Sequence, residues 1–132
     1  MLEYLLDTDI CIYAIKDRSD ALRRKFNEKA EGLCISSVTL SELYYGVFKS
    51  TRPDENRKVV TGFAARLPVL PFDEAVAHHA GDIRADLAKR GTPIGPYDVM
   101  IAATARSRGL VLVSNNEREF SRVDGLRLEN WT

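Results

Sequence analysis

The sequence contains few of the residues that zinc enzymes and disulfide-stabilised proteins depend on. Its 132 residues include two cysteines and two histidines. Cys11 and Cys34 both lie in apolar runs, so we expect free, buried thiols instead of a disulfide. His78 and His79 are adjacent and would point about 100° apart on a helix, so they cannot serve one metal ion together. These absences argue against a zinc site.

The sequence also lacks an excess of charge and any long apolar run. Lysine and arginine total 19, as do aspartate and glutamate, so the formal net charge is zero. This balance does not indicate nucleic-acid binding, since most nucleic-acid-binding domains have a basic excess. It does not exclude such binding, because the charges of an acidic pocket can cancel those of a basic rim in the net charge. No run approaches the roughly 18 apolar residues of a membrane span, and the N-terminus does not resemble a signal peptide. We therefore expect no membrane association and a cytoplasmic location.

The sequence does have short apolar runs that alternate with amphipathic segments. The runs predict short strands buried on both faces of a sheet at 2–6, 33–36, 68–72 and 110–114, with a last strand within 126–131. Helices are predicted over 10–16, 20–31, 37–49, 53–66, 73–89 and from 96 onward, whereas 115–120 is predicted as a turn. This order indicates one α/β domain over residues 1–132, a three-layer α/β/α sandwich around a central, mostly parallel sheet.

Acidic side chains fall where the predicted strands meet helices. Asp7 ends the first strand, and Glu42 lies about one turn into the helix after the second. Because ligands of open parallel sheets bind beyond the carboxyl ends of the strands, we expect both acids to meet the segment after Ser114 there. Asp98, in the first turn of a nearly apolar helix, joins them if that helix begins at the same edge.

Carboxylates gathered at one place repel one another and are driven toward protonation unless a cation lies among them. Hard divalent ions take oxygen ligands, so the acids predict Mg²⁺, for which Mn²⁺ can substitute, and not zinc. Such an ion lowers the pKa of a bound water and offsets charge on a phosphate group. The pattern therefore favours phosphodiester hydrolysis without a histidine base.

Other interpretations stay open from these residues alone. Asp7 is also a good helix N-cap, Glu42 could be a half-buried acid with a basic partner, and Asp98 suits the positive end of a helix dipole. A Mg²⁺-dependent DNA nuclease would have the same pocket. A non-enzymatic signalling or interaction module also carries acids at strand ends, although a receiver-like switch would have to be phosphorylated at Asp73.

Four segments together resemble a known family. They read "LLDTDICIYAIK", "ISSVTLSELYYGVFKS", "GTPIGPYDVMIAATARSRGLVLVSNNEREF" and "GLRLENW". In order and spacing they are similar to the VapC-type toxins of bacterial type II toxin–antitoxin pairs, which are PIN-domain ribonucleases. The resemblance covers essentially the whole chain.

This resemblance implies a function and partners. It implies a homodimeric, Mg²⁺-dependent endoribonuclease that inhibits translation by cutting structured RNA. The expected substrate is tRNA in the anticodon stem-loop, with initiator tRNA favoured. It also implies a VapB-like antitoxin that wraps the toxin and inserts its C-terminal segment into the acidic site, in a larger hetero-oligomer that binds operator DNA.

By position, Asp7, Glu42 and Asp98 match the family's catalytic acids, and Asp7 and Asp98 match its Mg²⁺ ligands. Ser114 matches a small hydroxyl residue at a strand end. Thr8, which follows Asp7 directly, is a further candidate for a supporting role.

The sequence departs from the family at two positions. Asn116 stands near the place where many PIN domains have a fourth acid, so Glu119 or a water is expected to do that work. Asp9 stands where close relatives have asparagine, and it adds negative charge beside the site. The candidates for contacts with the RNA backbone are Lys16, Arg18, Lys49, Arg52, Arg106, Arg108 and Arg118.

Overall fold

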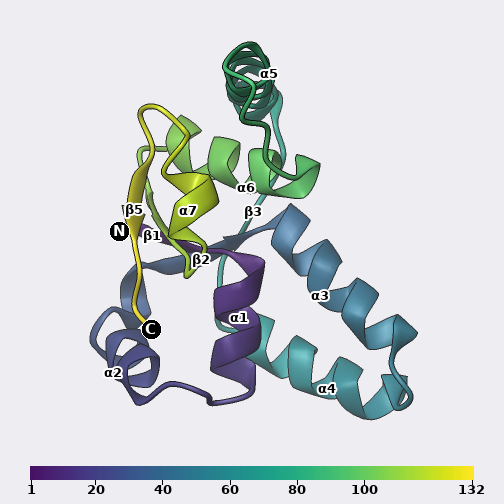
Figure 1. Cartoon of the computed structure of the whole chain (residues 1–132). Coiled ribbons are helices and arrows are strands. Elements are labelled where there is room, and N and C mark those ends of the chain that lie inside the picture. The colour runs from purple at the N-terminus through teal and green to yellow at the C-terminus, as the bar shows by residue number, and fades with distance from the viewer.

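The computed structural model describes all 132 residues, which form five short strands and seven α-helices (Figure 1). The strands are β1 Tyr4–Leu6, β2 Leu33–Ser36, β3 Val69–Leu70, β4 Val111–Val113 and β5 Arg127–Glu129. The helices are α1 Thr8–Ile15, α2 Asp20–Glu28, α3 Ser37–Lys49, α4 Pro53–Ala64, α5 Glu74–Lys89, α6 Pro96–Ser107 and α7 Glu117–Phe120, with a 3₁₀ turn η1 at Ala30–Gly32.

The strands form one sheet in the order β3-β2-β1-β4-β5, and every neighbouring pair is parallel. The chain moves outward from β1 to β3 and then returns to the other side of β1 with β4. Tyr4 in the central strand pairs with Leu33 of β2 and Val111 of β4. The order reverses at β1, so the residues that follow β1, β2 and β4 meet at the switch point of the sheet.

Alternate strand residues enter two cores, one on each face of the sheet. Leu5 and Leu112 pack with α5 and α6, whereas Leu6, Ile35 and Val113 pack against helices α1 to α4. Figure 1 shows α5 and α6 on one side of the sheet, α1 and α2 on the other, and the α3–α4 hairpin projecting sideways. These layers confirm the predicted α/β/α sandwich with a parallel sheet.

Two predicted elements differ from the structure. Helix α2 ends at Glu28 instead of continuing to residue 31, because the chain tightens into the 3₁₀ turn that precedes β2. The segment predicted as a turn at 115–120 contains the short helix α7. Its last residue, Phe120, is 1% exposed and belongs to the core beneath α5 and α6. Tertiary packing therefore stabilises a helix that is too short to form by itself.

Both cysteines are free and buried, as predicted. Burial raises the pKa of the Cys34 thiol to about 11, and only the charge of Arg108 opposes this effect. Burial also raises the pKa of the Cys11 thiol, so neither thiol is reactive near neutral pH. None of the helices combines the length and the apolarity that crossing a bilayer requires.

Candidate active site

Asp7 occupies the carboxyl end of the central strand. Its backbone N–H donates to the carbonyl of Val113 in β4, at 3.1 Å, which holds the residue at the edge of the sheet. Its Oδ1 accepts the N–H of Ile10 at 2.8 Å, so Asp7 is also the N-cap of α1. The residue is only 3% exposed. Asp7 is thus both of the things that the sequence allowed, a helix cap and a buried acid at the strand end.

The surroundings of Asp7 favour its neutral form in the metal-free protein. Burial raises the pKa of Asp7 to about 7, against an ordinary value of 3.8. Hydrogen bonds from the Ser114 hydroxyl and the Ile10 N–H oppose this effect, whereas the charges of Asp9 and Asp98 add to it. A cation beside Asp7 would remove the cost of ionising it.

Asp98 joins this edge because α6 begins there. Figure 1 shows the N-terminal ends of α1, α3 and α6 facing the same space. Burial, together with the nearby charges of Glu119, Glu42 and Asp9, raises the pKa of Asp98 to about 6. The predicted condition for Asp98, a helix that starts at the carboxyl edge, is met.

Glu42 is held by hydroxyl groups from two helices. The Thr8 hydroxyl at the start of α1 donates to Glu42 Oε1 at 2.7 Å. The same Thr8 oxygen lies 3.2 Å from the hydroxyl oxygen of Thr39, a fully buried residue in the first turn of α3. Thr8 was expected from the sequence to support the site, whereas Thr39 was not, although its spacing of three residues from Glu42 places both on one face of α3.

The segment after β4 brings the last three predicted residues to the site. Ser114 is fully buried, and its oxygen accepts the backbone N–H of Asn116 at 2.9 Å. The side-chain amide of Asn116 donates to Glu119 Oε2 at 3.2 Å. Because Glu119 lies on α7 and raises the pKa of Asp98, the helix that sequence reasoning missed carries the additional acid.

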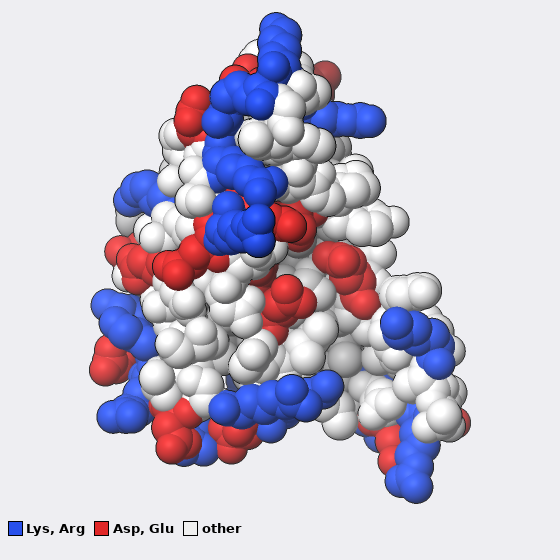
Figure 2. All heavy atoms as spheres, viewed as in Figure 1, with Lys and Arg blue, Asp and Glu red and all other residues white.

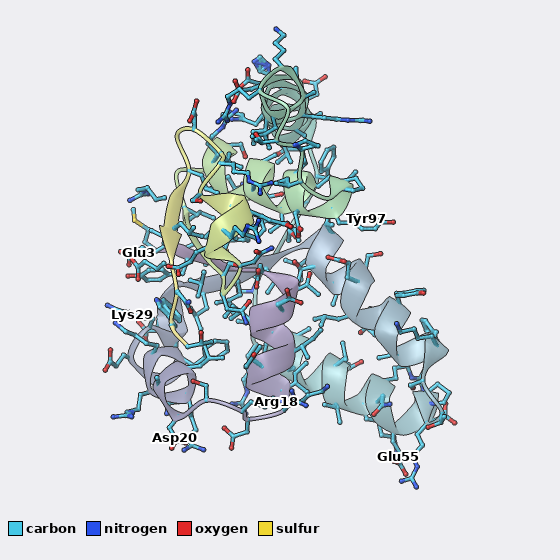
Figure 3. All side chains as sticks on the ribbon, viewed as in Figure 1. Glu3, Arg18, Asp20, Lys29, Glu55 and Tyr97 are labelled. Atoms are coloured by element: carbon cyan, nitrogen blue, oxygen red, sulfur yellow. The ribbon has the colours of Figure 1, made fainter.

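No basic side chain forms an ion pair with any of these acids. The ion pairs of the structure all involve other carboxylates. Figure 2 shows acidic side chains gathered in a hollow near the centre of this face, with basic side chains along its upper and lower borders. In Figure 3, Tyr97 projects outward from the start of α6, whereas Arg18 lies at the far end of α1. The charge of the acids is therefore left uncompensated by the protein.

Two candidate RNA-binding arginines have structural contacts elsewhere. At the C-terminal end of α6, Arg106 donates to Asp82 Oδ2 at 2.7 Å and to His79 Nδ1 at 2.9 Å. Arg108 donates to Asp73 Oδ2 at 3.1 Å. Asp73 also caps α5. These contacts disfavour Asp73 as a phosphorylation site, and they place both arginines at the opposite end of α6 from Asp98.

The site suits a hydrated divalent ion better than a fully protein-ligated one. No three Asp, Glu, His or Cys side chains converge closely enough to hold an ion by direct contacts alone. Mg²⁺ typically binds one or two carboxylates and keeps several waters. Asp7 is a buried carboxyl without a cationic partner, and the charge of nearby Asp98 raises the pKa of Asp7. These two residues are therefore suited to bind the ion directly.

Comparison with known proteins agrees with this geometry. The PIN domain family matches residues 4–126. The tRNA(fMet)-specific endonuclease VapC of Shigella flexneri is 54% identical over 132 residues, which is all of both chains. Ribonuclease VapC2 of Haemophilus influenzae is 51% identical over 131 residues, or 99% of each chain. The crystal structure of DNA-bound VapBC from Salmonella typhimurium contains a chain that superposes with a TM-score of 0.96, at 53% identity and full coverage of both.

The parallel sheet and its unpaired acids, together with these relatives, define a nuclease that hydrolyses phosphodiesters. The chain belongs to the PIN domain family, among its VapC-type members.

Proposed function

We propose that this chain is a single-domain, Mg²⁺-dependent endoribonuclease, the toxin of a type II toxin–antitoxin pair, which cuts structured RNA and so inhibits translation. The observation that carries the proposal is the buried carboxyl of Asp7, which lies at the sheet edge near Asp98 without any basic partner. We favour tRNA cut in the anticodon stem-loop, and initiator tRNA in particular, because the Shigella flexneri relative is named a tRNA(fMet)-specific endonuclease.

Each acid has a part in this proposal. Asp7 and Asp98 would hold Mg²⁺, or Mn²⁺ in its place, and the ion would supply an activated water and neutralise charge on the phosphate. Glu42 completes the acidic pocket and accepts a hydrogen bond that aligns the attacking water. Glu119 takes the place of the fourth acid. In-line attack on phosphorus would leave a 3′-hydroxyl and a 5′-phosphate.

Several polar groups keep the acids in place. Thr8 orients Glu42, the Ile10 N–H holds Asp7, and the Asn116 amide holds Glu119. The Ser114 hydroxyl beside Asp7 favours its ionised form. Positions near the N-terminal ends of helices favour such alignment, since a carboxylate misplaced by about 1 Å can cost roughly a hundredfold in rate. Asp9 is exposed and acts through its charge alone.

We further propose a homodimer and a VapB-like antitoxin whose complex binds operator DNA. The relative from Salmonella typhimurium was crystallised as DNA-bound VapBC. Helix α3 also carries large exposed apolar side chains, with Tyr45 at 66% and Phe48 at 69% exposure. Exposed aromatic residues of this size are typical of protein–protein contact surfaces.

The decisive experiment is to incubate the purified protein with initiator tRNA, elongator tRNAs and single-stranded DNA, with Mg²⁺ or with EDTA. We expect Mg²⁺-dependent cuts in the initiator anticodon stem-loop, and sequencing of the 5′-phosphorylated ends should locate them. Products with a 2′,3′-cyclic phosphate would exclude attack by water. Undiminished cleavage in EDTA would show that cleavage does not require a metal ion.

A further inference from the structure

Thr39 is a polar residue in a place where an apolar one would fit. It is fully buried in the first turn of α3, where its backbone N–H donates to the Ser36 hydroxyl at 3.0 Å. Its own hydroxyl has a single side-chain neighbour within hydrogen-bond distance, the Thr8 hydroxyl at 3.2 Å. Burying a hydroxyl costs free energy unless it is hydrogen-bonded, so this contact determines whether threonine is tolerated here.

The protons in this group can be assigned by counting them. An ionised Glu42 can only accept, so the one proton of Thr8 is used at 2.7 Å in the bond to Glu42 Oε1. The 3.2 Å contact between the two threonine hydroxyls is aligned with Thr8 pointing toward the Thr39 oxygen. Because the single proton of Thr8 is taken by the closer, charged oxygen of Glu42, we assign the proton of the Thr8–Thr39 contact to the Thr39 hydroxyl, which can rotate. The result is a chain of hydrogen bonds from Thr39 through Thr8 to Glu42, in which each bond polarises the next.

We infer that Thr39 is a positioning residue for the nuclease reaction: it fixes the Thr8 hydroxyl, which in turn fixes the carboxylate of Glu42 at the edge of the acidic pocket. These hydrogen bonds link the first turns of α1 and α3. The half-buried carboxylate of Glu42 is therefore held by groups at the starts of two helices. This role rests on the proposed nuclease function and adds to it a residue that never touches the substrate.

A merely structural Thr39 would behave differently from a positioning one. Thr39→Val keeps the shape and the packing but removes the donor, whereas Thr39→Ser keeps the donor and loses a methyl group. Thr8→Val removes the central link, and Thr8→Ser keeps it. A packing role predicts that serine harms the protein more than valine does, and a positioning role predicts the reverse for catalysis.

The test measures kcat and KM for cleavage of initiator tRNA by these variants with Mg²⁺. We expect Thr8→Val to lower kcat about tenfold and Thr39→Val about threefold, with KM unchanged, while both serine variants stay near the parental rate. In the Thr8→Val background, Thr39→Val should have no further effect on kcat, because Thr39 acts only through Thr8. Full kcat in Thr39→Val, with the parent active, would overturn the positioning role and leave the nuclease function intact.

A urea-unfolding cycle provides a measurement that does not depend on activity. Thr8→Val leaves the buried hydroxyl of Thr39 without its partner, so adding Thr39→Val should then increase stability or leave it unchanged. The same substitution in the parental background should lower stability, and a roughly threefold difference in unfolding equilibrium constant should separate the two backgrounds. Additive effects would show that the two hydroxyls are not coupled and would overturn the inference. A parent that cuts no RNA would overturn the proposed function, and the catalytic role of Thr39 with it.

Discussion

Two groups of acids in this molecule have opposite surroundings. On α5, Asp82 pairs with Arg106 of α6, and Asp86 pairs with Arg90, both at 2.7 Å. The hydrogen bond and the charge of Arg106 hold the pKa of Asp82 below its ordinary value. At the carboxyl edge of the sheet, Asp7 has no basic partner and its pKa is raised. The comparison shows that only one group of acids is left with an electrostatic cost that a divalent ion would relieve.

The paired group contributes to the architecture of the fold. Arg106 donates to His79 and Asp82 on α5, and to the carbonyl of Asp124 in the loop before β5 at 3.0 Å. One guanidinium therefore links α6, on which it lies, to two other parts of the chain. The acids at the sheet edge have no basic partner and accept hydrogen bonds only from neutral groups, such as the Thr8 hydroxyl on Glu42 and the Ile10 N–H on Asp7. This is the arrangement expected where free energy of folding is given up for chemistry.

The strongest way to break the comparison is to neutralise one acid from each group. Asp98→Asn should lower cleavage by roughly 10³-fold, because metal-ion stabilisation of phosphoryl transfer contributes several kcal/mol. Asp82→Asn, at a paired acid, should leave kcat within about twofold. Single-turnover cleavage of initiator tRNA measures both. Comparable losses in the two variants would mean that the distinction between the groups has no functional meaning.

The second prediction concerns stability in the metal-free protein. Asp7 has a pKa of about 7 when folded and about 3.8 when unfolded. Below pH 3.8, Asp7 is protonated in both states and does not affect stability. As the pH rises from about 4 to 7, Asp7 ionises in the unfolded state but keeps its proton in the folded state, so the free energy of unfolding falls. The full difference corresponds to about 4 kcal/mol. Asp7→Asn keeps the cap on α1 and stays neutral, so we expect it to be more stable than the parent by about 2–4 kcal/mol at pH 8.

Urea unfolding in EDTA from pH 4 to pH 8 checks this prediction. The advantage of Asp7→Asn should vanish near pH 4, and a constant advantage at all pH values would contradict it. Asp82→Asn supplies the control of opposite sign. Because Arg106 lowers the pKa of Asp82, this acid stabilises the fold at neutral pH, and its contribution is lost as the pH falls through that lowered pKa.

The sequence predicted where the acids lie better than it predicted which groups hold them in place. Asp7 and Glu42 follow from strand ends in a parallel sheet, a rule that depends only on chain order. Asp98 needed a condition on the direction of its helix, which the structure meets. The bond between Thr8 and Glu42 could not be predicted, because it joins side chains of two helices whose relative placement depends on packing.

The same limit explains the remaining differences. Helix α7 has four residues, and it forms because Phe120 is buried in the core, so local sequence preference carries little information about it. Arg106 and Arg108 read as ordinary basic residues and therefore as candidates for RNA contacts. Their partners, Asp82 and Asp73, lie 24 and 35 residues away in the chain. Nothing in local pattern or spacing indicates such pairs.

A third prediction sharpens the comparison through metal binding. An ion that binds only the folded state stabilises it by mass action, by about 2.7 kcal/mol when its concentration is 100 times the dissociation constant. Mg²⁺ and Mn²⁺ should therefore raise the melting temperature of the parent and of Asp82→Asn, but not that of Asp98→Asn, and EDTA should reverse the change. The stabilisation should weaken below pH 7, where protons compete with the ion for Asp7. If the melting temperature of Asp98→Asn rose by the same amount, the ion would bind at another site.

The smallest expected effect belongs to Asp9, the one member of the acidic edge that is exposed. Its charge raises the pKa of both Asp7 and Asp98, but solvent and salt screen it. Asp9→Asn should therefore lower both pKa values and move the acidic limb of the kcat–pH profile down by about 0.3 pH unit. The shift should shrink in 0.5 M salt if it is purely electrostatic. A shift toward higher pH, or a large loss of kcat, would mean that Asp9 contacts the ion or the RNA directly and belongs with Asp7 and Asp98.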